Sequence, residues 1–346
     1  MNARPPSPGF WILIQVVCLL GGCSAGNESG ALLGAETAAP GGPPYLAMVA
    51  LQKVTANHTP HRIEVNSSAV VPHAMVSLGR GDAHLATVIP DFLLQMQKGT
   101  GRYSKLENAA EVAANIRLIH SFRAGAYHFV VYADSDVRSF EDFKGKSIFA
   151  GPLRGGSATM SRMFIEAGTG YVAGRDYTMV DLDMRGGDAA FMDGHIDILI
   201  RTPAIGAAMI EQLGITRDIR LIGFNDRTID YLENEVRRVG RFLTVIPPGT
   251  YNGQANTEPV RTMGFLQLTG VNRSVPEEVV YDITRALWSH LDEFKSVSPE
   301  LLGSLSPGTA FDGMSGRLHA GAYRYYRETG FDVPPEVLPV ESDHGR

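Results

Sequence analysis

The sequence contains little cysteine and no excess of positive charge. Cysteine occurs only at positions 18 and 23, near the start of the chain, so we expect no disulfide and no thiol chemistry in the folded part. The net charge is −6 at pH 7, with no Lys/Arg-rich stretch interleaved with aromatic residues. Nucleic-acid binding requires such a basic surface, and we therefore expect no nucleic-acid partner.

The sequence motifs of common enzymes are also missing. The stretch GPLRGGSATM, Gly151 to Met160, is rich in glycine, but no lysine follows, so it fails the Walker pattern, and it contains neither GxGxxG nor GxSxG. A secreted hydrolase using Ser157 remains a distant alternative, because no base accompanies that serine. His58 and His61 form an HxxH spacing without nearby carboxylates or cysteines, which argues against zinc. We expect no enzyme, no cofactor and no metal.

Residues 1–23 differ in kind from the rest of the chain. An apolar run, FWILIQVVCLL, follows Arg4 and predicts an export signal. It is shorter than the roughly 20 apolar residues that span a bilayer. The sequence LGGC ending at Cys23 resembles a bacterial lipobox, in which Cys23 would carry a lipid; cleavage nearby without a lipid is the alternative. Residues 24–40 are small, polar and rich in glycine, and we predict a flexible tether.

Alternating strand and helix patterns over the remaining chain predict an α/β fold. RIEV, AHLATVI and SIFAG read as strands separated by helices, which implies parallel pairing with helices on both faces of a sheet. Counting these units predicts two α/β lobes with a returning C-terminal segment. We expect residues 41–124 and 252–346 in lobe 1 and residues 125–251 in lobe 2.

The candidate ligand contacts are the residues directly after the predicted strands, because α/β folds bind ligands beyond the carboxyl ends of their strands. Hydroxyl groups at helix starts attract an anion together with the free backbone N–H groups. Arginine can form two hydrogen bonds to a carboxylate. The candidates are Ser67, Ser68, Asp91, Arg154, Ser157, Thr159, Arg201 and Thr202, with Tyr45 and Tyr251 as walls of the cleft.

Structural roles are the alternative for several candidates. The serines could serve only as helix N-caps. Arg201 could form a surface ion pair with Asp181 or Asp183, although it follows the largely apolar run IDILI without a turn and should therefore emerge at the end of the sheet. Asp91 could cap the first turn of a helix instead of binding a ligand amine.

Four stretches of the sequence, in their order along the chain, carry a resemblance to a known family. They are SSAVVPHAMVSLGRGDAHLATVIPD, DVRSFEDFKGKSIFAGPLRGGSATM, FMDGHIDILIRTPAIGAAMIEQL and IPPGTYNGQANTEPVRTMGFLQLTGVNRSVPEEVVYDITRALW. With the closing LHAGAYRYYRETG, they make Pro43 to Gly330 similar to the TAXI-type solute receptors of tripartite ATP-independent periplasmic (TRAP) transporters.

The resemblance implies a two-lobe periplasmic binding protein of type II-like fold, with the ligand cleft between the lobes. It implies a monomeric periplasmic receptor that captures a small anionic solute, a carboxylate or an amino acid such as glutamate, and delivers it to TRAP-type permease subunits. Its only membrane contact would be the lipid on Cys23. Ser157 and Thr159 then become hydroxyl donors of a carboxylate cradle. A receptor of similar fold serving an ABC importer or a sensor kinase is the alternative.

The chain departs from the family pattern at three places. GAETAAPGGPPY stands where a TGG-like run usually precedes the first tyrosine, and Ala320 stands where proline usually follows the histidine. Arg154 adds a charge to a loop that is more often neutral, which predicts either a more acidic ligand or a displaced one.

Overall fold

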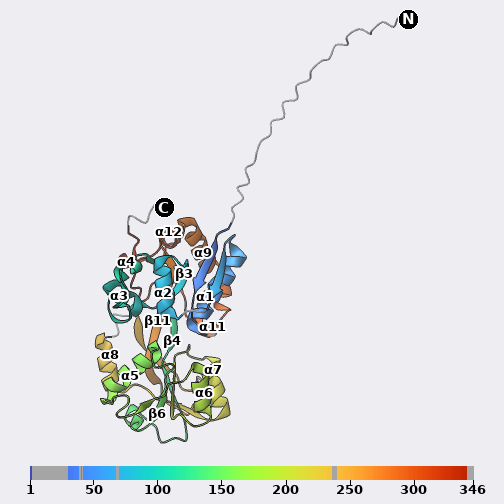
Figure 1. Ribbon diagram of the computed structural model, residues 1–346. Helices are drawn as coiled ribbons and strands as arrows, with labels where there is room; N and C mark the ends of the chain where they lie inside the picture. Colours follow the sequence, from blue (N-terminus) through green and yellow to red (C-terminus); the bar gives the residue numbers. More distant parts are fainter. Residues whose placement is uncertain (2–29, 39, 41, 68–69, 236–239, 341–346) are drawn as a thin grey trace.

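The computed structural model describes residues 1, 30–38, 40, 42–67, 70–235 and 240–340, which form two stacked lobes (Figure 1). The predicted export signal, the lipidation site Cys23, most of the predicted tether and the candidate Ser68 lie outside the described residues. Within the described part, no helix is long and apolar enough to cross a membrane.

The upper lobe in Figure 1 is built from both ends of the chain around one mixed sheet. The sheet has the order β10-β11-β3-β1-β2, with β4 also paired to β11. Its strands are β1 (Leu32–Glu36), β2 (Arg62–Asn66), β3 (Leu85–Val88), β4 (Ile116–Ala126), β10 (Arg241–Ile246) and β11 (Val260–Asn272). Its helices are α1 (Pro43–His58), α2 (Val71–Arg80), α3 (Pro90–Lys98), α4 (Ala109–Ala113), α9 (Glu277–Ser289), α10 (Leu291–Lys295), α11 (Pro299–Leu302) and α12 (Ala320–Glu328), with short 3₁₀ turns η1 (Gly101–Tyr103), η4 (Pro307–Thr309) and η5 (Pro335–Val337).

The lower lobe is built from the middle of the chain around a second mixed sheet with the order β7-β6-β8-β5-β9. Its strands are β5 (His128–Tyr132), β6 (Ser147–Phe149), β7 (Thr178–Met179), β8 (Ile198–Arg201) and β9 (Ile219–Leu221). Its helices are α5 (Gly156–Thr169), α6 (Met184–Met192), α7 (Ala208–Thr216) and α8 (Asp226–Glu235), with the 3₁₀ turn η2 (Phe140–Phe143). The predicted class, α/β with two lobes, is confirmed.

The tether predicted for residues 24–40 is wrong at its C-terminal end. Leu32–Glu36 form strand β1, which pairs in parallel with both β2 and β3. The reason is burial: Leu33 and Ala35, which alternate with more exposed neighbours, point into the core of the upper lobe. Because β1 lies between them, β2 and β3 are not direct neighbours in the sheet.

The expected parallel pairing is found in only part of each sheet. Strand β11 is antiparallel to β3, β4 and β10, because it enters the upper lobe from below and so runs opposite to β3. In the lower lobe, β5 is antiparallel to β8 and β9, while β6 pairs in parallel with β7 and β8. Both sheets are therefore mixed.

The chain joins the sheet of the upper lobe again with β10 (Arg241–Ile246), which was predicted in lobe 2, and then goes back to the lower lobe. The side chain of Asn256 accepts a bond from the backbone N–H of Leu221 (2.8 Å) and donates one to its carbonyl (2.9 Å), which fixes the loop 247–259 to the lower sheet. The chain enters the upper sheet for the last time with β11, so residues 252–259, predicted in lobe 1, belong to lobe 2. Strands β4 and β11, paired along most of their length, connect the two lobes.

Candidate functional site

The carboxyl ends of strands from both lobes meet at the junction between the lobes. In the upper lobe, Val88 at the end of β3 pairs with Leu268, whereas Leu85 pairs with Val271, farther along the ascending β11. Strand β3 therefore ends towards the lower lobe. In the lower lobe, the end of β8 lies opposite the start of β5, with Arg201 paired to His128, directly after the chain has crossed from β4. This is the position at which α/β folds bind ligands.

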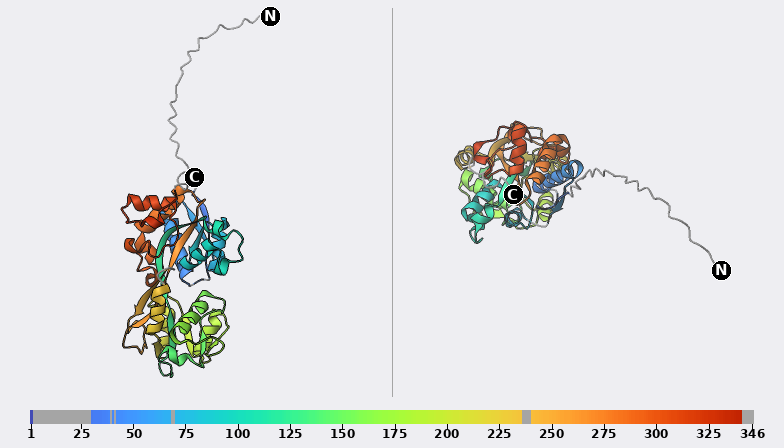
Figure 2. Two further views of the ribbon diagram at one scale, coloured as in Figure 1. Left: turned by 90° about the vertical axis from the view of Figure 1, so that its left-hand side faces the viewer. Right: turned by 90° about the horizontal axis from the view of Figure 1, so that it is seen from above.

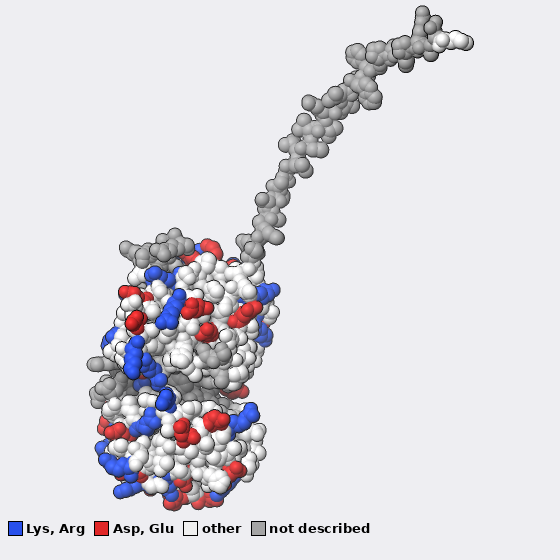
Figure 3. All heavy atoms as spheres, in the orientation of Figure 1, with Lys and Arg blue, Asp and Glu red and all other residues white. Residues whose placement is uncertain are grey.

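The start of α5 lies directly below the upper lobe. A Cβ placed on Gly156 would lie 3.7 Å from the ring of Phe92 in α3 and 3.9 Å from a guanidinium nitrogen of Arg102. The Arg102 guanidinium lies over the Phe92 ring at 4.5 Å from its centroid. In Figure 3, Lys and Arg atoms gather at one side of the waist between the lobes. We call this region, formed by the ends of β1, β3, β6 and β8 and the start of α5, the interlobe site.

The upper wall of the interlobe site carries a satisfied ion pair. Asp91, in the first turn of α3, lies 3.1 Å from Arg241 at the start of β10, and its Oδ2 also accepts a bond from Gln95 at 3.0 Å. Both side chains of the pair are about four-fifths buried. The role of Asp91 as a partner for a ligand amine stays a prediction, but its charge is already balanced by Arg241, which is not among the predicted site residues.

The lower wall carries an ion pair that is not satisfied. Arg201 is only 9% exposed, and its Nη2 lies 3.2 Å from Oδ2 of Asp188 in α6. Its Nη1 contacts the sulfur of Met184, and among the described residues its Nε and the Asp188 Oδ1 have no hydrogen-bond partner. The expected emergence of Arg201 at the sheet end agrees with the structure, but its partner is Asp188 rather than Asp181 or Asp183, and the pair is buried rather than on the surface.

Burial explains the electrostatics of this pair. Loss of solvation raises the pKa of Asp188, and the nearby Arg201 cation opposes that rise. Loss of solvation likewise lowers the pKa of Arg201, opposed by Asp188. Because desolvation is the larger effect on both groups, the pair does not fully compensate for its own burial. Additional hydrogen bonds from a ligand would therefore be favourable here.

The first turn of α5 contains a second unsatisfied group. The N-cap of α5 is Gly155, so Ser157 lies inside the helix and is not the cap, and its buried hydroxyl has no partner in the described part of the chain. Arg154 is exposed in the turn before α5. Thr159 is corrected as a ligand donor, because its hydroxyl donates to the carbonyl of Gly155 at 3.0 Å within the helix.

The other candidates have different surroundings. Ser67 is half-buried directly after β2, and the N-cap of the following helix is Val70. Tyr45 is half-buried in the first turn of α1. Thr202 is half-buried at the lobe junction, where a Cβ on Gly125 would lie 2.6 Å from its carbonyl oxygen. Ser67, Tyr45 and Thr202 remain predicted ligand contacts.

Tyr251 is corrected as a cleft wall. It is only 3% exposed, and its hydroxyl accepts a bond from the Gly206 N–H (2.9 Å) and lies 2.7 Å from Nε2 of His128. Burial raises its pKa to about 12. Tyr251 therefore lies in the core of the lower lobe, where it bonds Gly206 and His128, the strand partner of Arg201.

Several residues of the interlobe site were not predicted from the sequence. Thr37 follows β1, is completely buried and has an unpartnered hydroxyl within the described chain. The alternation in LLGAE was a signal for the strand that positions it. Arg102 lies in a 3₁₀ turn, Asp188 in the middle of α6 and Arg241 at the start of β10. Their partners come from other elements of the fold, so no local pattern identifies them.

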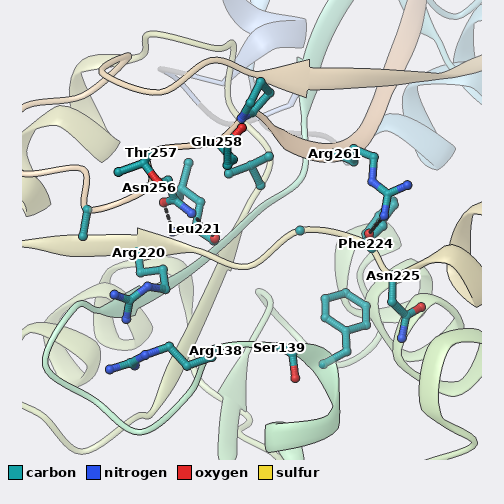
Figure 4. Close-up of a pocket in the computed structure, with 15 residues that line it drawn as sticks. Arg138, Ser139, Arg220, Leu221, Phe224, Asn225, Asn256, Thr257, Glu258 and Arg261 are labelled. Carbon is teal, nitrogen blue, oxygen red and sulfur yellow. Dashed lines mark hydrogen bonds between the residues drawn. The ribbon is translucent and has the colours of Figure 1, made fainter.

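A cavity of about 500 Å³ lies along the edge strand β9 of the lower lobe (Figure 4). The side chains of Arg138 and Arg220 extend next to each other there. Burial and the neighbouring Arg138 cation lower the pKa of Arg220. However, Arg220 donates to the Ala133 carbonyl and Arg261 pairs with Asp226, so both guanidinium groups already bind protein oxygens. We therefore place the candidate site at the interlobe junction and not in this cavity.

A smaller cavity of about 170 Å³ touches both lobes. It lies between β4, β10 and α11, with Arg123 and Phe242 on one side and Ala204 on the other. The Arg123 guanidinium covers the Phe242 ring at 4.7 Å and lies 3.7 Å from Asp312. The presence of this cavity indicates that the lobes do not pack tightly along the whole junction.

Several solved structures are similar to this chain. A TctC solute binding protein from Polaromonas aligns with 12% identity and a TM-score of 0.48, covering 79% of this chain and 88% of that one. The aliphatic sulphonate binding protein SsuA from Escherichia coli aligns with 12% identity and a TM-score of 0.45, covering 87% and 84%. The ectoine-binding protein of the TeaABC TRAP transporter of Halomonas elongata aligns with 16% identity and a TM-score of 0.41, covering 86% and 90%.

All three TM-scores lie below 0.5, and the likenesses identify no ligand for this chain. The sequence comparison is more specific. A model of the NMT1-like family matches residues 36–330, from the end of β1 to the glycine that follows α12. This match covers both lobes and every described residue of the interlobe site, and the protein belongs to the NMT1-like family.

Proposed function

We propose that the protein is an extracytoplasmic solute receptor that captures a small amino acid or carboxylate at the interlobe site and delivers it to a membrane permease. The observation that carries this proposal is the unsatisfied pair of Arg201 and Asp188. Within the part of the chain that the structure describes, the pair offers one N–H and one carboxylate oxygen without a hydrogen-bond partner. An α-amino acid carries the complementary groups, a carboxylate and an ammonium, so a zwitterion satisfies both atoms without adding net charge to a buried site.

The start of α5 supplies the remaining recognition of the carboxylate. The first backbone N–H groups of a helix have no partner within the helix, and its dipole favours an anion. Ser157 adds a hydroxyl that has no partner in the described chain, and Arg102 and the exposed Arg154 add positive charge near the same turn. Met184 covers Arg201 and is 46% exposed, so its flexible side chain is free to move aside when the ligand enters.

A thermal-melting screen tests the ligand class. The protein is unfolded and refolded to remove any carried-over solute, and is then melted with three compounds of one carbon skeleton: an α-amino acid, the corresponding α-keto acid, and the amine lacking the carboxylate. A ligand that binds only the folded state raises the melting temperature in a concentration-dependent way. We expect the order amino acid, keto acid, amine. A larger rise in melting temperature with the keto acid would indicate that the ligand is a simple carboxylate and not a zwitterion. No rise with any small acid would reject the proposed function.

The proposed partner is a permease of the TRAP type, as for the TAXI receptors that the sequence resembles, with the receptor acting as a periplasmic monomer attached at most through Cys23. The alternative is a receptor for an ABC importer or a sensor kinase. The adjacent genes distinguish these: an integral TRAP permease supports the first and an ATPase the second. A serine hydrolase is disfavoured because the Ser157 hydroxyl contacts no base among the described residues.

A further inference from the structure

A second cluster of ligand-type side chains lies on the upper lobe, outside the interlobe site. His58, His290 and Glu293 each offer one ligand atom, and these three atoms lie within 4.8 Å of one another. The rings of His58 and His290 are stacked, with centroids 3.3 Å apart and an interplanar angle of 4°. Nε2 of His58 lies 2.6 Å from Oε2 of Glu293. The three ligand atoms are therefore grouped within the reach of one metal ion.

Three elements of the fold bring these residues together. His58 is the last residue of α1, where the partial negative charge of the helix end favours a cation. His290 is at the junction of α9 and α10, and Glu293 follows three residues later in the first turn of α10, so the two share one helical face. The HxxH spacing considered in the sequence is not the arrangement formed, because His61 instead lies 3.3 Å from Asp282.

A supporting contact orients the carboxylate. Asn57 donates a hydrogen bond of 2.6 Å to Oε1 of Glu293, which leaves Oε2 directed at His58. Outer contacts of this kind hold metal ligands in place in known metal sites. The nearest cation, Lys53, donates to Ser296 at 3.3 Å, so its ammonium is held by a neighbouring hydroxyl.

We propose that His58, His290 and Glu293 bind a divalent transition metal, Zn²⁺, on the upper lobe. Two imidazole nitrogens and one carboxylate oxygen form a common zinc ligand set, with water at the fourth position. Tetrahedral ligands about 2 Å from zinc are about 3.3 Å apart, so binding requires one of the two parallel imidazole rings to rotate out of the stack. The 16 residues of α1 place His58 about 24 Å from the helix start at the lobe junction. The metal links α1 to the α9–α10 junction and does not contact the solute.

Zinc titration of the untagged, chelator-treated protein tests this site. We expect one Zn²⁺ per chain by calorimetry, a rise in melting temperature, and, with Co²⁺ in place of Zn²⁺, visible absorption of a four-coordinate ion. His290→Gln should weaken binding at least tenfold, since loss of even a supporting contact costs about that much. His73→Gln, at an exposed histidine of α2, is the matched control and should bind as the wild type does.

Absence of saturable Zn²⁺ binding by the folded wild type would overturn the proposal, as would equal weakening in the two histidine variants. If His290→Gln does not fold, Glu293→Gln supplies the same test. The solute screen described above is repeated with and without Zn²⁺. We expect equal melting shifts from the solute in both, so failure of the metal site and failure of the receptor function give different results.

Discussion

The upper and lower walls of the interlobe site each contain one arginine–aspartate pair at nearly the same distance, 3.1 Å and 3.2 Å, but the two pairs differ in their remaining bonds. Asp91 is also bonded to Gln95, whereas Arg201 and Asp188 each retain an atom without a partner in the described chain. Equal geometry therefore does not imply equal function. The upper pair stabilises the wall, and the lower pair has bonding capacity left for a ligand.

Removing Arg201 is the strongest test of this difference. Arg201→Ala leaves the Asp188 carboxylate, which is 29% exposed, without its counter-ion, and should lower the free energy of unfolding by about 3 kcal/mol, the lower end of the cost of breaking a buried pair. The same variant should lose solute binding by about 100-fold, equivalent to about 3 kcal/mol for charged hydrogen bonds. Chemical denaturation and calorimetry measure the two effects.

A double variant separates folding from binding. Arg201→Met with Asp188→Leu replaces the pair by apolar groups and should recover most of the stability while still failing to bind solute. Asp91→Asn in the upper wall leaves the largely buried Arg241 without its counter-ion, so it should also lower the free energy of unfolding, but it should leave solute affinity unchanged. Full solute affinity in the double variant would show that the lower pair is structural, like the upper one.

Acid titration sharpens the comparison of the lobes, because each contains one completely buried histidine. Burial lowers the pKa of His120 in the upper lobe and of His128 beside Arg201 to about 4. The unfolded chain takes up these protons near pH 6.5, so the stability each neutral ring provides is present above pH 6.5 and is lost as pH falls towards 4. The loss is about 3 kcal/mol for each histidine.

Unfolding measured at several pH values checks this acid effect. His120→Gln and His128→Gln should each flatten the decline of stability between pH 6.5 and 4. An unchanged slope in either variant would mean that the histidine concerned is not buried in its neutral form.

Removing the Tyr251 hydroxyl should have a smaller effect on stability, through contacts within the lower lobe alone. Tyr251→Phe removes the acceptor of the Gly206 N–H and the partner of His128, and should reduce the free energy of unfolding by about 1–2 kcal/mol. Because the ring is in the core, calorimetry should give an unchanged solute affinity. A large loss of affinity with full stability would instead support the cleft-wall role predicted from the sequence.

The smallest effects concern the start of α5. Ser157→Ala removes an unpartnered hydroxyl and should weaken solute binding about tenfold, equivalent to about 1.4 kcal/mol. Thr159→Ala is the matched control, since its hydroxyl is bonded to Gly155, and should leave affinity unchanged. Equal effects of the two substitutions would remove Ser157 from the site.

Local patterns in the sequence predicted the two α/β lobes and most strand ends, because hydrophobic periodicity and helix starts are properties of neighbouring residues. The position of Arg201 at a sheet end follows from the apolar run before it. Its partner does not, because Asp188 reaches it only through the packing of α6 against β8. Similarly, His58 meets His290 only after the C-terminal helices return to α1, and β1 becomes a strand only because β2 and β3 lie on either side of it.

The helices at the interlobe junction begin with different residues, and this difference has a consequence for the order of events in capture. Helices α1, α2 and α3 of the upper lobe each have proline in the first two positions, so each lacks a backbone N–H there. Helix α5 begins with glycine and serine and keeps all of its N–H groups. An arriving anion therefore finds more donors below than above. We expect the solute to dock first on the lower lobe, to be enclosed when the upper lobe closes on it, and to stay with the lower lobe when the lobes separate at the permease.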